Sequence, residues 1–535
     1  MDVTDASDRL GGRDGTTIIL VAVTLLAAVA RYGYAIHSGF SSANDIDGPT
    51  YFAGAVQLVH GRLPYRDFAF VQPPAVVLLA SPFALASRLV GTRDAFTAVR
   101  VFMPMVDVAS VWVVGRRVRH RGPIAVLVGA GGLAVYMPAV LSTRTLLLEP
   151  WLDLFCLLAL TFAFDRRGSL ASGRRIWIAG VFMGLAVAVK LWAVFPLVVL
   201  GAWCLWYPGR ARRFATFVIG VLAGFGVPSF VFVVASPRRF FHDVVVSQLN
   251  RLNERIPFSW RMGDVLGITK VGQPHAISTR TIVVAFVVLA VFLLATVRAL
   301  AVMHRRPTAL AVCALVSTAV AFAILMIPGE FPYHYPDFLS PFAAVTFGLA
   351  AGTLAEAFAR KAVAKAVLAT LVAAAVVAVL VNDVPLLDPL RATSYGAILD
   401  QLIPPGACVV TDYTAVTIAA NRYISSDRSC PVIVDPYGLD LTLDNGHTPI
   451  DPGEPTQAVI SAWRSAFEQT DWIVLTTSAR ARIPLVPSVK SYLQTNFTQV
   501  GNRGVLVYER SSMLPRAHAL GAALRGRLLM VPSRA

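Results

Sequence analysis

Charged residues are scarce in this sequence: only 15% of its 535 residues are Asp, Glu, Lys or Arg, against roughly 25% in a soluble globular protein. Acidic residues are the scarcer kind, with 31 of them against 47 basic residues, so the formal net charge is +16. Hydrophobic residues make up 56% of the chain, and the mean hydropathy is +0.64. These values exclude an ordinary soluble domain and indicate a protein that crosses a membrane several times.

The basic excess does not indicate nucleic acid as a partner, because most arginines lie in short clusters between apolar runs, as they do in the cytoplasmic loops of membrane proteins. Two further features are lacking. The polar N-terminus has neither a basic start nor a cleavage site, so the first apolar run is expected to be an anchor and not a removed signal peptide. No repeat of roughly 20–50 residues is evident, and no two halves have matching hydropathy.

Cysteine is rare as well, and its five positions are of two kinds. Cys156, Cys204 and Cys313 lie inside apolar segments, where each is expected to pack as a small buried hydrophobic residue. Cys408 and Cys430 are the pair in the polar C-terminal region. If this region lies outside the cell, a disulfide between them is expected, because such compartments are oxidising.

The apolar runs predict about eleven transmembrane helices, at about 20 residues for each span. Nine runs are taken as one span each: 16–36, 96–115, 123–141, 150–165, 213–235, 280–302, 308–328, 337–358 and 364–382. A further apolar block, 176–207, is too long for one span and contains Lys190. We therefore expect two short helices that turn at the outer face around this lysine.

Five basic clusters test this count, because cytoplasmic loops collect arginine and lysine. With eleven spans all five fall on one side, which places the N-terminus in the cytoplasm and everything after Asp383 outside the plasma membrane. The clusters begin at Arg116, Arg166, Arg210, Arg298 and Arg360. The apolar stretch Pro73–Val90 must then not span, and we expect it to be an interfacial or re-entrant helix.

The predicted fold class is a polytopic α-helical membrane protein with a small C-terminal extracytoplasmic α/β domain. The expected divisions are a transmembrane domain over 1–382 with an outer loop 37–95, the α/β domain over 383–515 and a polar tail over 516–535. In the α/β domain, strands are predicted at 408–413, 430–438, 471–477 and 504–510, with helices at 397–402 and 456–469.

The first outer loop carries the residues around which we expect the chemistry. Asp45 and Asp47 lie near the outer face of the membrane, where a carboxylate is costly unless it binds a cation or takes part in a reaction. The pair either chelates Mg²⁺ or Mn²⁺, or supplies a general base and a group that orients it. Capping of a predicted helix over 48–60 by Asp47 is the structural alternative.

Four more polar positions are expected at the same face. Glu149 begins the fourth span, as a partner of the helix dipole or as a second acid of the site. Lys190 suits a lipid phosphate, with simple snorkelling as the alternative. Arg251 lies in the arginine-rich outer loop 236–279, whose guanidinium groups suit a phosphate or nearby acidic residues. His334 suits a metal ligand, a proton shuttle or a structural role.

In the order and sidedness of these motifs, the chain over residues 15–380 resembles the membrane-embedded GT-C class of glycosyltransferases, which includes actinobacterial mannosyl- and arabinosyltransferases. The shared pattern is an acidic pair in the first outer loop, an aromatic helix, G-x-x-P-Y and P-P. These motifs are Asp45/Asp47, residues 51–59, Gly61–Tyr65 and Pro73-Pro74 in this sequence. An acid before the fourth span and a lysine in a short hairpin, here Glu149 and Lys190, are also similar to the class.

The resemblance implies inverting transfer of a sugar from a polyprenyl-phosphate donor to a glycan, lipid or protein acceptor outside the membrane. Asp45 or Asp47 would be the general base, and Glu149 would help to hold the acceptor or, with Asp47, a divalent cation (Mg²⁺ or Mn²⁺). The C-terminal domain would recognise the acceptor. The residues expected to bind substrate are Tyr51, Arg62, Tyr65, Arg66, Lys190, Arg251 and His334.

One position departs from the class: Gln72 stands before the two prolines, where many relatives carry a basic residue. The contact with phosphate would then fall to Arg62, Arg66 or loop 236–279. The main alternative function is a transporter or flippase of a lipid-linked sugar, which would need polar groups at the membrane midplane, with Asp107 as the main candidate. A non-catalytic scaffold is a third possibility.

Overall fold

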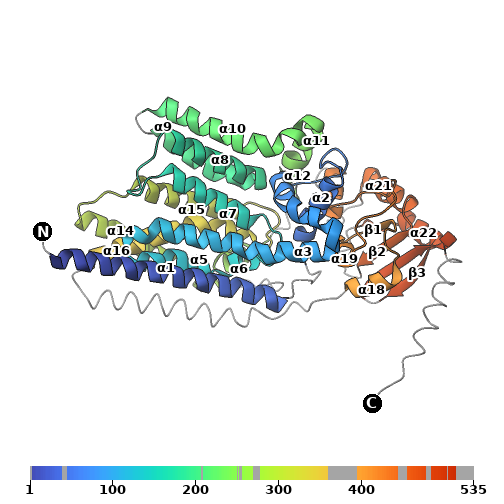
Figure 1. Ribbon diagram of the computed structural model, residues 1–535, viewed down its shortest axis with the longest axis horizontal. Coiled ribbons are helices and arrows are strands. Elements are labelled where there is room, and N and C mark those ends of the chain that lie inside the picture. Colours follow the sequence, from blue (N-terminus) through green and yellow to red (C-terminus); the bar gives the residue numbers. More distant parts are fainter. Residues whose placement is uncertain are drawn as a thin grey trace, which may run out of the picture.

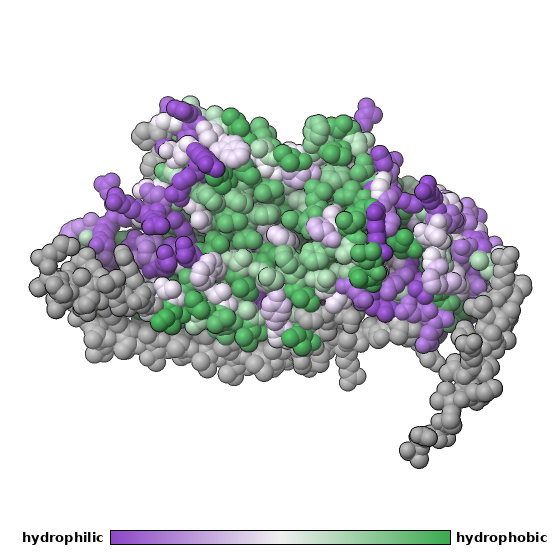
Figure 2. All heavy atoms as spheres, viewed as in Figure 1, coloured by the Kyte–Doolittle hydropathy of each residue, from purple (hydrophilic) through white to green (hydrophobic). Residues whose placement is uncertain are grey.

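The computed structural model describes residues 3–38, 45–206, 209–249, 251, 256–268, 277–358, 395–443, 455–476, 483–502 and 504–513. The predicted span 364–382, the predicted boundary between the domains at 382–383 and the predicted tail 516–535 lie outside the described residues. Figure 1 shows long helices running side by side, with a unit of strands and short helices at one end of them. Figure 2 shows a broad hydrophobic band between two hydrophilic ends, as expected of a protein embedded in a membrane.

Five of the described helical stretches are long and apolar enough to cross a membrane: Gly15–Ile36, Ala75–Arg121, Arg210–Ala235, Thr279–Val302 and Tyr335–Ala357. The helices that build the bundle are α1 (Val3–Ser38), α3 (Ala75–Val118), α7 (Glu149–Ala163), α8 (Arg174–Val189), α9 (Val194–Trp206), α10 (Arg210–Ala235), α14 (Thr279–Val302), α15 (Ala309–Leu325) and α16 (Ser340–Ala357). The apolar block 176–207 forms two helices, α8 and α9, which break at Lys190 as predicted.

Helices α8 and α10 approach each other closely through glycine. A Cβ atom at Gly180 or Gly220 would lie 2.2 Å from a backbone oxygen of the facing helix. Because apolar burial drives helices together only weakly in lipid, such close backbone contact is a main source of stability between membrane helices.

The predicted span 123–141 is not one helix. It consists of α4 (Pro123–Val126), the π-helix η2 (Leu127–Gly131), α5 (Gly132–Val135) and α6 (Met137–Ser142), with Tyr136 extended between the last two. Pro138 explains the break, because proline has no N–H and its ring clashes with the carbonyl of the preceding turn. The buried Arg31 guanidinium donates to the freed carbonyls of Leu133 and Ala134, at 3.1 and 2.8 Å.

Arg31 also forms a buried ion pair with Asp107, with 2.5 Å between Nη2 and Oδ2. Asp107, the main candidate for a polar group at the midplane, is therefore part of a structural network that joins α1, α3 and the break before α6.

The first outer loop forms the helix α2 (Asp47–Val59) and the first arm of α3. The stretch Pro73–Val90, which we expected to be an interfacial or re-entrant helix, forms the first part of α3, and a non-helical break at Gly91 (φ 84°) follows it. A helix of 44 residues is about 65 Å long, which is more than twice the thickness of the hydrocarbon core. The arm before Gly91 therefore extends beyond the hydrocarbon region, and its side chains Leu85, Leu89 and Val90 are exposed.

The C-terminal unit has a four-stranded sheet in the order β1-β2-β4-β3, and β1 and β2 are its only parallel pair among the described strands. Its elements are β1 (Val409–Thr411), β2 (Trp472–Thr476), β3 (Phe497–Asn502), β4 (Val505–Arg510), α18 (Tyr395–Leu402), α19 (Thr414–Ala419), α20 (Pro436–Leu443), α21 (Gln457–Glu468) and α22 (Pro487–Asn496). A disulfide joins Cys408 to Cys430.

The strand predicted at 430–438 is wrong, because this segment has no strand and ends in α20. Its apolar side chains are divided between two cores and do not share one sheet face. Val432 and Val434 pack with the helical bundle, whereas Ile433 packs with the core of the C-terminal unit. The sheet is completed by β3, which the sequence did not indicate.

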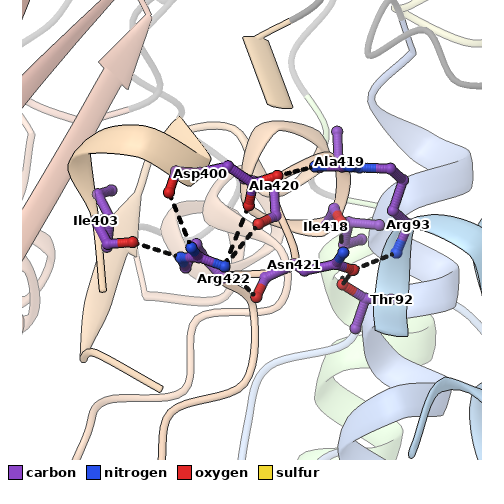
Figure 3. A network of polar contacts seen from close by, with 9 residues as sticks. All are labelled: Thr92, Arg93, Asp400, Ile403, Ile418, Ala419, Ala420, Asn421 and Arg422. Carbon is purple, nitrogen blue, oxygen red and sulfur yellow. Dashed lines mark hydrogen bonds and ion pairs between the residues drawn. The ribbon is translucent and has the colours of Figure 1, made fainter. Parts of the chain in front are cut away.

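The C-terminal unit is docked on α3 immediately after Gly91 (Figure 3). Arg93 pairs with Asp400, with 2.5 Å between Nη2 and Oδ2, and the backbone N–H of Arg93 donates to the side chain of Asn421 at 2.9 Å. The Thr92 hydroxyl donates to the carbonyl of Ile418 at 3.0 Å. These contacts hold the unit against one end of the helical bundle.

Candidate active site

Two carboxylates far apart in the sequence meet on either side of one imidazole. Asp47 is the first residue of α2, Glu149 is the first residue of α7, and His334 directly precedes η5 (Tyr335–Leu339). Nε2 of His334 lies 3.5 Å from Oδ2 of Asp47, and Nδ1 lies 3.0 Å from Oε2 of Glu149. The structure thus brings together three residues that the sequence proposed separately.

Gly48 allows this approach. A Cβ atom at Gly48 would lie 2.0 Å from Oγ1 of Thr145 and 3.0 Å from the backbone nitrogen of Leu146. The start of α2 therefore packs directly on the segment that leads into α7, which places Asp47 near Glu149.

Asp45, and not Asp47, caps α2. Its Oδ2 accepts a hydrogen bond from the Gly48 N–H at 2.9 Å, whereas the structure shows no side-chain cap from the residue at the N-cap position, Ile46. The structural alternative placed Asp47 at the N-cap of a helix over 48–60, but the helix begins at Asp47 itself, so Asp47 is its first residue and Ile46 holds the N-cap position. Asp45 is buried and its Oδ1 lies 4.0 Å from Nη2 of Arg144, while the side chain of Asp47 is 43% exposed. Only Asp47 of this pair has its carboxylate at an accessible surface.

Glu149 is enclosed by cations. Its side chain is fully buried, and its Oε1 accepts a hydrogen bond from Nζ of Lys190 at 2.6 Å. The ammonium group also lies 4.0 Å from the ring centre of Trp192 and 4.2 Å from that of Tyr335, a cation–π arrangement. The charge of Lys190 is therefore balanced inside the protein and is not presented to the surface.

His334 is held in its charged form. Burial lowers the pKa of the imidazole, but the nearby carboxylates of Glu149 and Asp47 outweigh burial and raise the pKa to about 9. At neutral pH an imidazolium therefore links an exposed carboxylate to a buried one.

A second cluster stands beside the first. Arg251 pairs with Glu330, with 3.0 Å between Nη1 and Oε2, and the hydroxyl of Tyr437 donates to the other oxygen of Glu330. The Nε atom of Arg251 is buried and has no hydrogen-bond partner among the residues that the structure describes. Burial, followed by the charges of Asp47 and Glu149, raises the pKa of Tyr51 well above its usual value, while Arg251 opposes this shift. The hydroxyl of Tyr51 therefore lies within the electrostatic reach of both clusters.

Three residues that were expected to bind substrate lie at the other end of α2. Tyr65 is buried, donates to the carbonyl of Gln72 at 2.6 Å and packs edge-to-face on Phe240. Arg66 pairs with Asp67 at 2.8 Å, and a guanidinium nitrogen of Arg62 donates to the carbonyl of Arg428 at 3.0 Å. The structure does not bring Arg62, Tyr65 or Arg66 to His334.

The divalent cation expected at Asp47 and Glu149 stays a prediction, and it would have to compete with positive groups that already lie at this place. Both carboxylate oxygens of Glu149 face cations, Lys190 at one and His334 at the other. A metal ion there would replace one of these positive groups or lie against it. Within the described ranges, no three His, Cys, Asp or Glu side chains are grouped so as to hold a metal ion.

Sequence reasoning did not assign roles to Glu330 and Tyr437 in this site. Glu330 lies in the same loop as His334, so its proximity was a usable signal. Tyr437 lies at the start of α20 in the C-terminal unit, and no sequence pattern links it to Arg251. Only the docking of the two units brings it there.

Comparisons with known proteins agree with this architecture. Residues 70–328 match glycosyltransferase family 87. Over its length the structure is similar to ArnT from Cupriavidus metallidurans bound to undecaprenyl phosphate, with 14% identity, a TM-score of 0.59 and coverage of 92% of this chain and 98% of that one. No curated protein matches the chain in sequence.

Two further solved structures share the fold. The oligosaccharyltransferase of Archaeoglobus fulgidus in its apo form has 12% identity and a TM-score of 0.56, with coverage of 86% of this chain and 69% of that one. The arabinofuranosyltransferase AftD from Mycobacteria has 14% identity and a TM-score of 0.52, with coverage of 93% and 40%. The resemblance predicted from the sequence is therefore confirmed: the chain has the GT-C fold of membrane glycosyltransferases, and its residues 70–328 are similar to glycosyltransferase family 87.

Proposed function

We propose that the protein transfers a sugar from a polyprenyl-phosphate donor to an acceptor outside the membrane, with inversion at the anomeric carbon. One observation carries this proposal: the accessible carboxylate of Asp47 is held by the buried chain His334–Glu149–Lys190, where the apolar bundle meets the polar C-terminal unit. This row alternates negative and positive side chains, and three of the four are buried. Burying so many charges is costly, and such clusters are typical of a functional site.

Asp47 is the proposed general base. The acceptor hydroxyl loses its proton to Asp47 as its oxygen attacks the anomeric carbon, and the bond from that carbon to the phosphate oxygen breaks. His334 is the proposed positioning residue, because its imidazolium orients the Asp47 carboxylate and keeps it ionised. Asp45 supports the start of α2 and does not take part in proton transfer. Of the two aspartates that the sequence offered as the general base, we therefore choose Asp47.

Arg251 is the proposed contact to the donor phosphate. Its buried Nε atom, which has no partner within the described part of the chain, is a donor that a phosphate oxygen would satisfy, and a guanidinium binds phosphate through two parallel hydrogen bonds. Stabilising the charge on the leaving phosphate supplies much of the rate enhancement in such reactions. The sequence suggested Lys190 for this role, but its ammonium is paired with Glu149, so we assign Lys190 to holding that carboxylate.

An apolar cavity suits the lipid part of the donor. Its volume is about 550 Å³, and it opens between α14, α15, α16 and α13 (Phe258–Val265). Aromatic residues on its walls include Tyr136, Phe286, Phe322 and Phe347. The ArnT structure is bound to undecaprenyl phosphate, and an archaeal AglB structure of this fold contains a dolichol-phosphate, which supports a polyprenyl carrier for this chain as well.

We also propose that the C-terminal unit, residues 383–515, lies outside the plasma membrane, that the N-terminus is cytoplasmic and that about eleven helices span residues 1–382. Contacts between the basic loops support this topology, because loops on the same side of a membrane can contact one another. Arg121 and Arg305 both pair with Glu356, and Arg117 donates to the carbonyl of Asp165. The observation that favoured a transporter, Asp107, is explained by its ion pair with Arg31.

The test is a transfer assay with purified full-length protein, radiolabelled polyprenyl-phosphate sugars and cell-envelope acceptors, with and without a chelator. The proposal expects labelled acceptor with at least one donor and loss of label for Asp47→Asn at unchanged membrane abundance. Equal transfer by Asp47→Asn and the wild type would contradict the proposal. Movement of intact lipid-linked sugar across a vesicle membrane, without transfer, would establish the transporter instead.

A further inference from the structure

A second cavity, of about 830 Å³, lies between the bundle and the C-terminal unit, away from His334. One wall is the C-terminal end of α2 with the following turn, residues 57–67, and the other is built from β1 and residues 423–433. Asp47 stands at the opposite end of α2, and a helix of 13 residues is about 20 Å long. The cavity is therefore separate from the reacting atoms but lies on the same outer face.

The chemistry of the walls suits hydroxyl groups. Three arginines and two aspartates line the cavity, so their formal charges nearly cancel, and serines and threonines stand between them. The two aspartates are already engaged: Asp67 pairs with Arg66, and Asp427 accepts hydrogen bonds from Ser429. Such a mixture offers donors and acceptors together without a strong net charge, which matches a ligand whose groups both donate and accept.

The volume of the cavity and an aromatic residue on its wall also suit a sugar ligand. Ligand pockets typically measure about 300–1,000 Å³, so the cavity has room for a ligand larger than one sugar. Tyr423 lines it and is fixed by a hydrogen bond from its hydroxyl to the carbonyl of Ala53 at 3.3 Å. Its ring, which also packs on the core of the bundle, adds an apolar surface to this wall that suits the C–H groups of a sugar.

Residues 423–433, which form the second wall together with β1, are held in place without regular secondary structure of their own. The disulfide between Cys408 and Cys430 ties residues 423–433 to the start of β1, and the hydroxyls of Ser425 and Ser426 donate to the carbonyl of Gly406. Arg62 donates across the cavity to the carbonyl of Arg428. A wall fixed before the ligand arrives loses little conformational freedom on binding, which favours affinity.

We propose that this cavity binds a neutral oligosaccharide, as the part of the acceptor that is remote from the reacting hydroxyl. The inference rests on the proposed function, since it gives the acceptor of that reaction its chemical class. It also explains why Arg62 and Arg66, expected from the sequence to bind substrate, lie away from His334.

The test compares two acceptors that present the same reacting sugar, one a short glycoside and the other a neutral oligosaccharide. Arg62→Gln combined with Arg428→Gln is expected to raise the KM for the long acceptor at least tenfold and to leave kcat and the short acceptor unchanged. Arg464→Gln, on α21 and outside the cavity, is the matched control. Ser426→Trp, at an exposed position that lines the cavity, is a second variant that blocks the space without removing a charge.

Direct binding separates this inference from the proposed function. Asp47→Asn protein should bind the neutral oligosaccharide as the wild type does, although it transfers no sugar. Normal transfer with unchanged KM in both cavity variants would overturn the inference alone. Tighter binding of an anionic oligosaccharide or of inorganic phosphate than of the neutral probe would overturn it as well. Oligosaccharide binding that depends on Arg62, in a wild-type protein that transfers no lipid-linked sugar, would contradict the proposed function and retain the site.

Discussion

Nε2 of His334 lies 3.5 Å from Oδ2 of Asp47, and the two side chains differ sharply in exposure, 5% against 43%. The buried ring therefore contacts a carboxylate that remains accessible. The other ring nitrogen faces Glu149, so any change in the charge of the imidazole acts on two carboxylates at once.

Separate replacement of Asp47 and Asp45 should distinguish the proposed general base from the residue that caps α2. Asp47→Asn should lower the rate of transfer by at least about 100-fold, since a positioned general base contributes roughly 10²–10⁴-fold. Asp45→Asn should retain most activity, because an asparagine oxygen can still accept the Gly48 N–H. Initial rates with a saturating lipid-linked donor measure both effects. A loss of equal size in the two variants would show that the aspartates act together.

The pH profile should report His334. Its pKa of about 9 lies above the usual 6.5, so the ion pairs of the imidazolium are fully present below about pH 6.5 and are lost as the pH rises through 9. Transfer by the wild type should therefore fall between pH 8 and pH 10. His334→Gln should be slower at pH 7 and lack this alkaline fall. An unchanged fall in His334→Gln would assign the titration to another group.

Removing Glu149 should cost more stability than removing one of its two partners, Lys190. Glu149→Gln leaves Lys190 and His334 without their buried counter-charge, and removing one partner of a buried ion pair costs about 3–5 kcal/mol. Lys190→Met should cost less, since His334 still faces the carboxylate. Thermal unfolding in detergent measures the order. Glu356→Gln is the control, because this partly exposed pair should contribute only about 0–1 kcal/mol.

Arg251 should act on the donor and not on the acceptor. Arg251→Lys keeps the positive charge but removes the planar fork, so the KM for the polyprenyl-phosphate sugar should rise about tenfold, in line with the loss of one charge-assisted hydrogen bond. The KM for the acceptor should not change. Kinetics with each substrate varied in turn provide the measurement, and an effect confined to the acceptor would contradict the assignment.

The sequence was informative where a charge interrupts an apolar pattern. Lys190 in the block 176–207 predicted the break between α8 and α9, and Glu149 at the start of an apolar run predicted the first residue of α7. A charge in a membrane is costly, so a charged residue is tolerated at few positions of a helix. Its place within an apolar run is therefore a usable signal in the sequence.

The remaining features depend on contacts between distant segments. Asp45 and Asp47 are equally suitable as caps by residue type, and the sequence does not fix the residue at which α2 begins, which decides that Asp45 accepts the Gly48 N–H. The strand β3 was missed because its sequence, FTQVGN, is mostly polar and only Phe497 is buried. The bridging role of His334 requires three loops to meet, which no local pattern encodes.

The break in α3 has a consequence for how the C-terminal unit is held on the bundle. At Gly91 the backbone has φ 84°, and a Cβ atom there would lie 2.7 Å from the amide oxygen of Asn421. Even alanine would thus be strained at this position, and its methyl group would press on the Asn421 side chain that accepts the Arg93 N–H in Figure 3. The hydroxyl of Tyr413, in the same C-terminal unit, donates to the carbonyl of Asp45. We therefore expect Gly91→Ala to lower sugar transfer through the docking of this unit, although it replaces none of the proposed reacting groups.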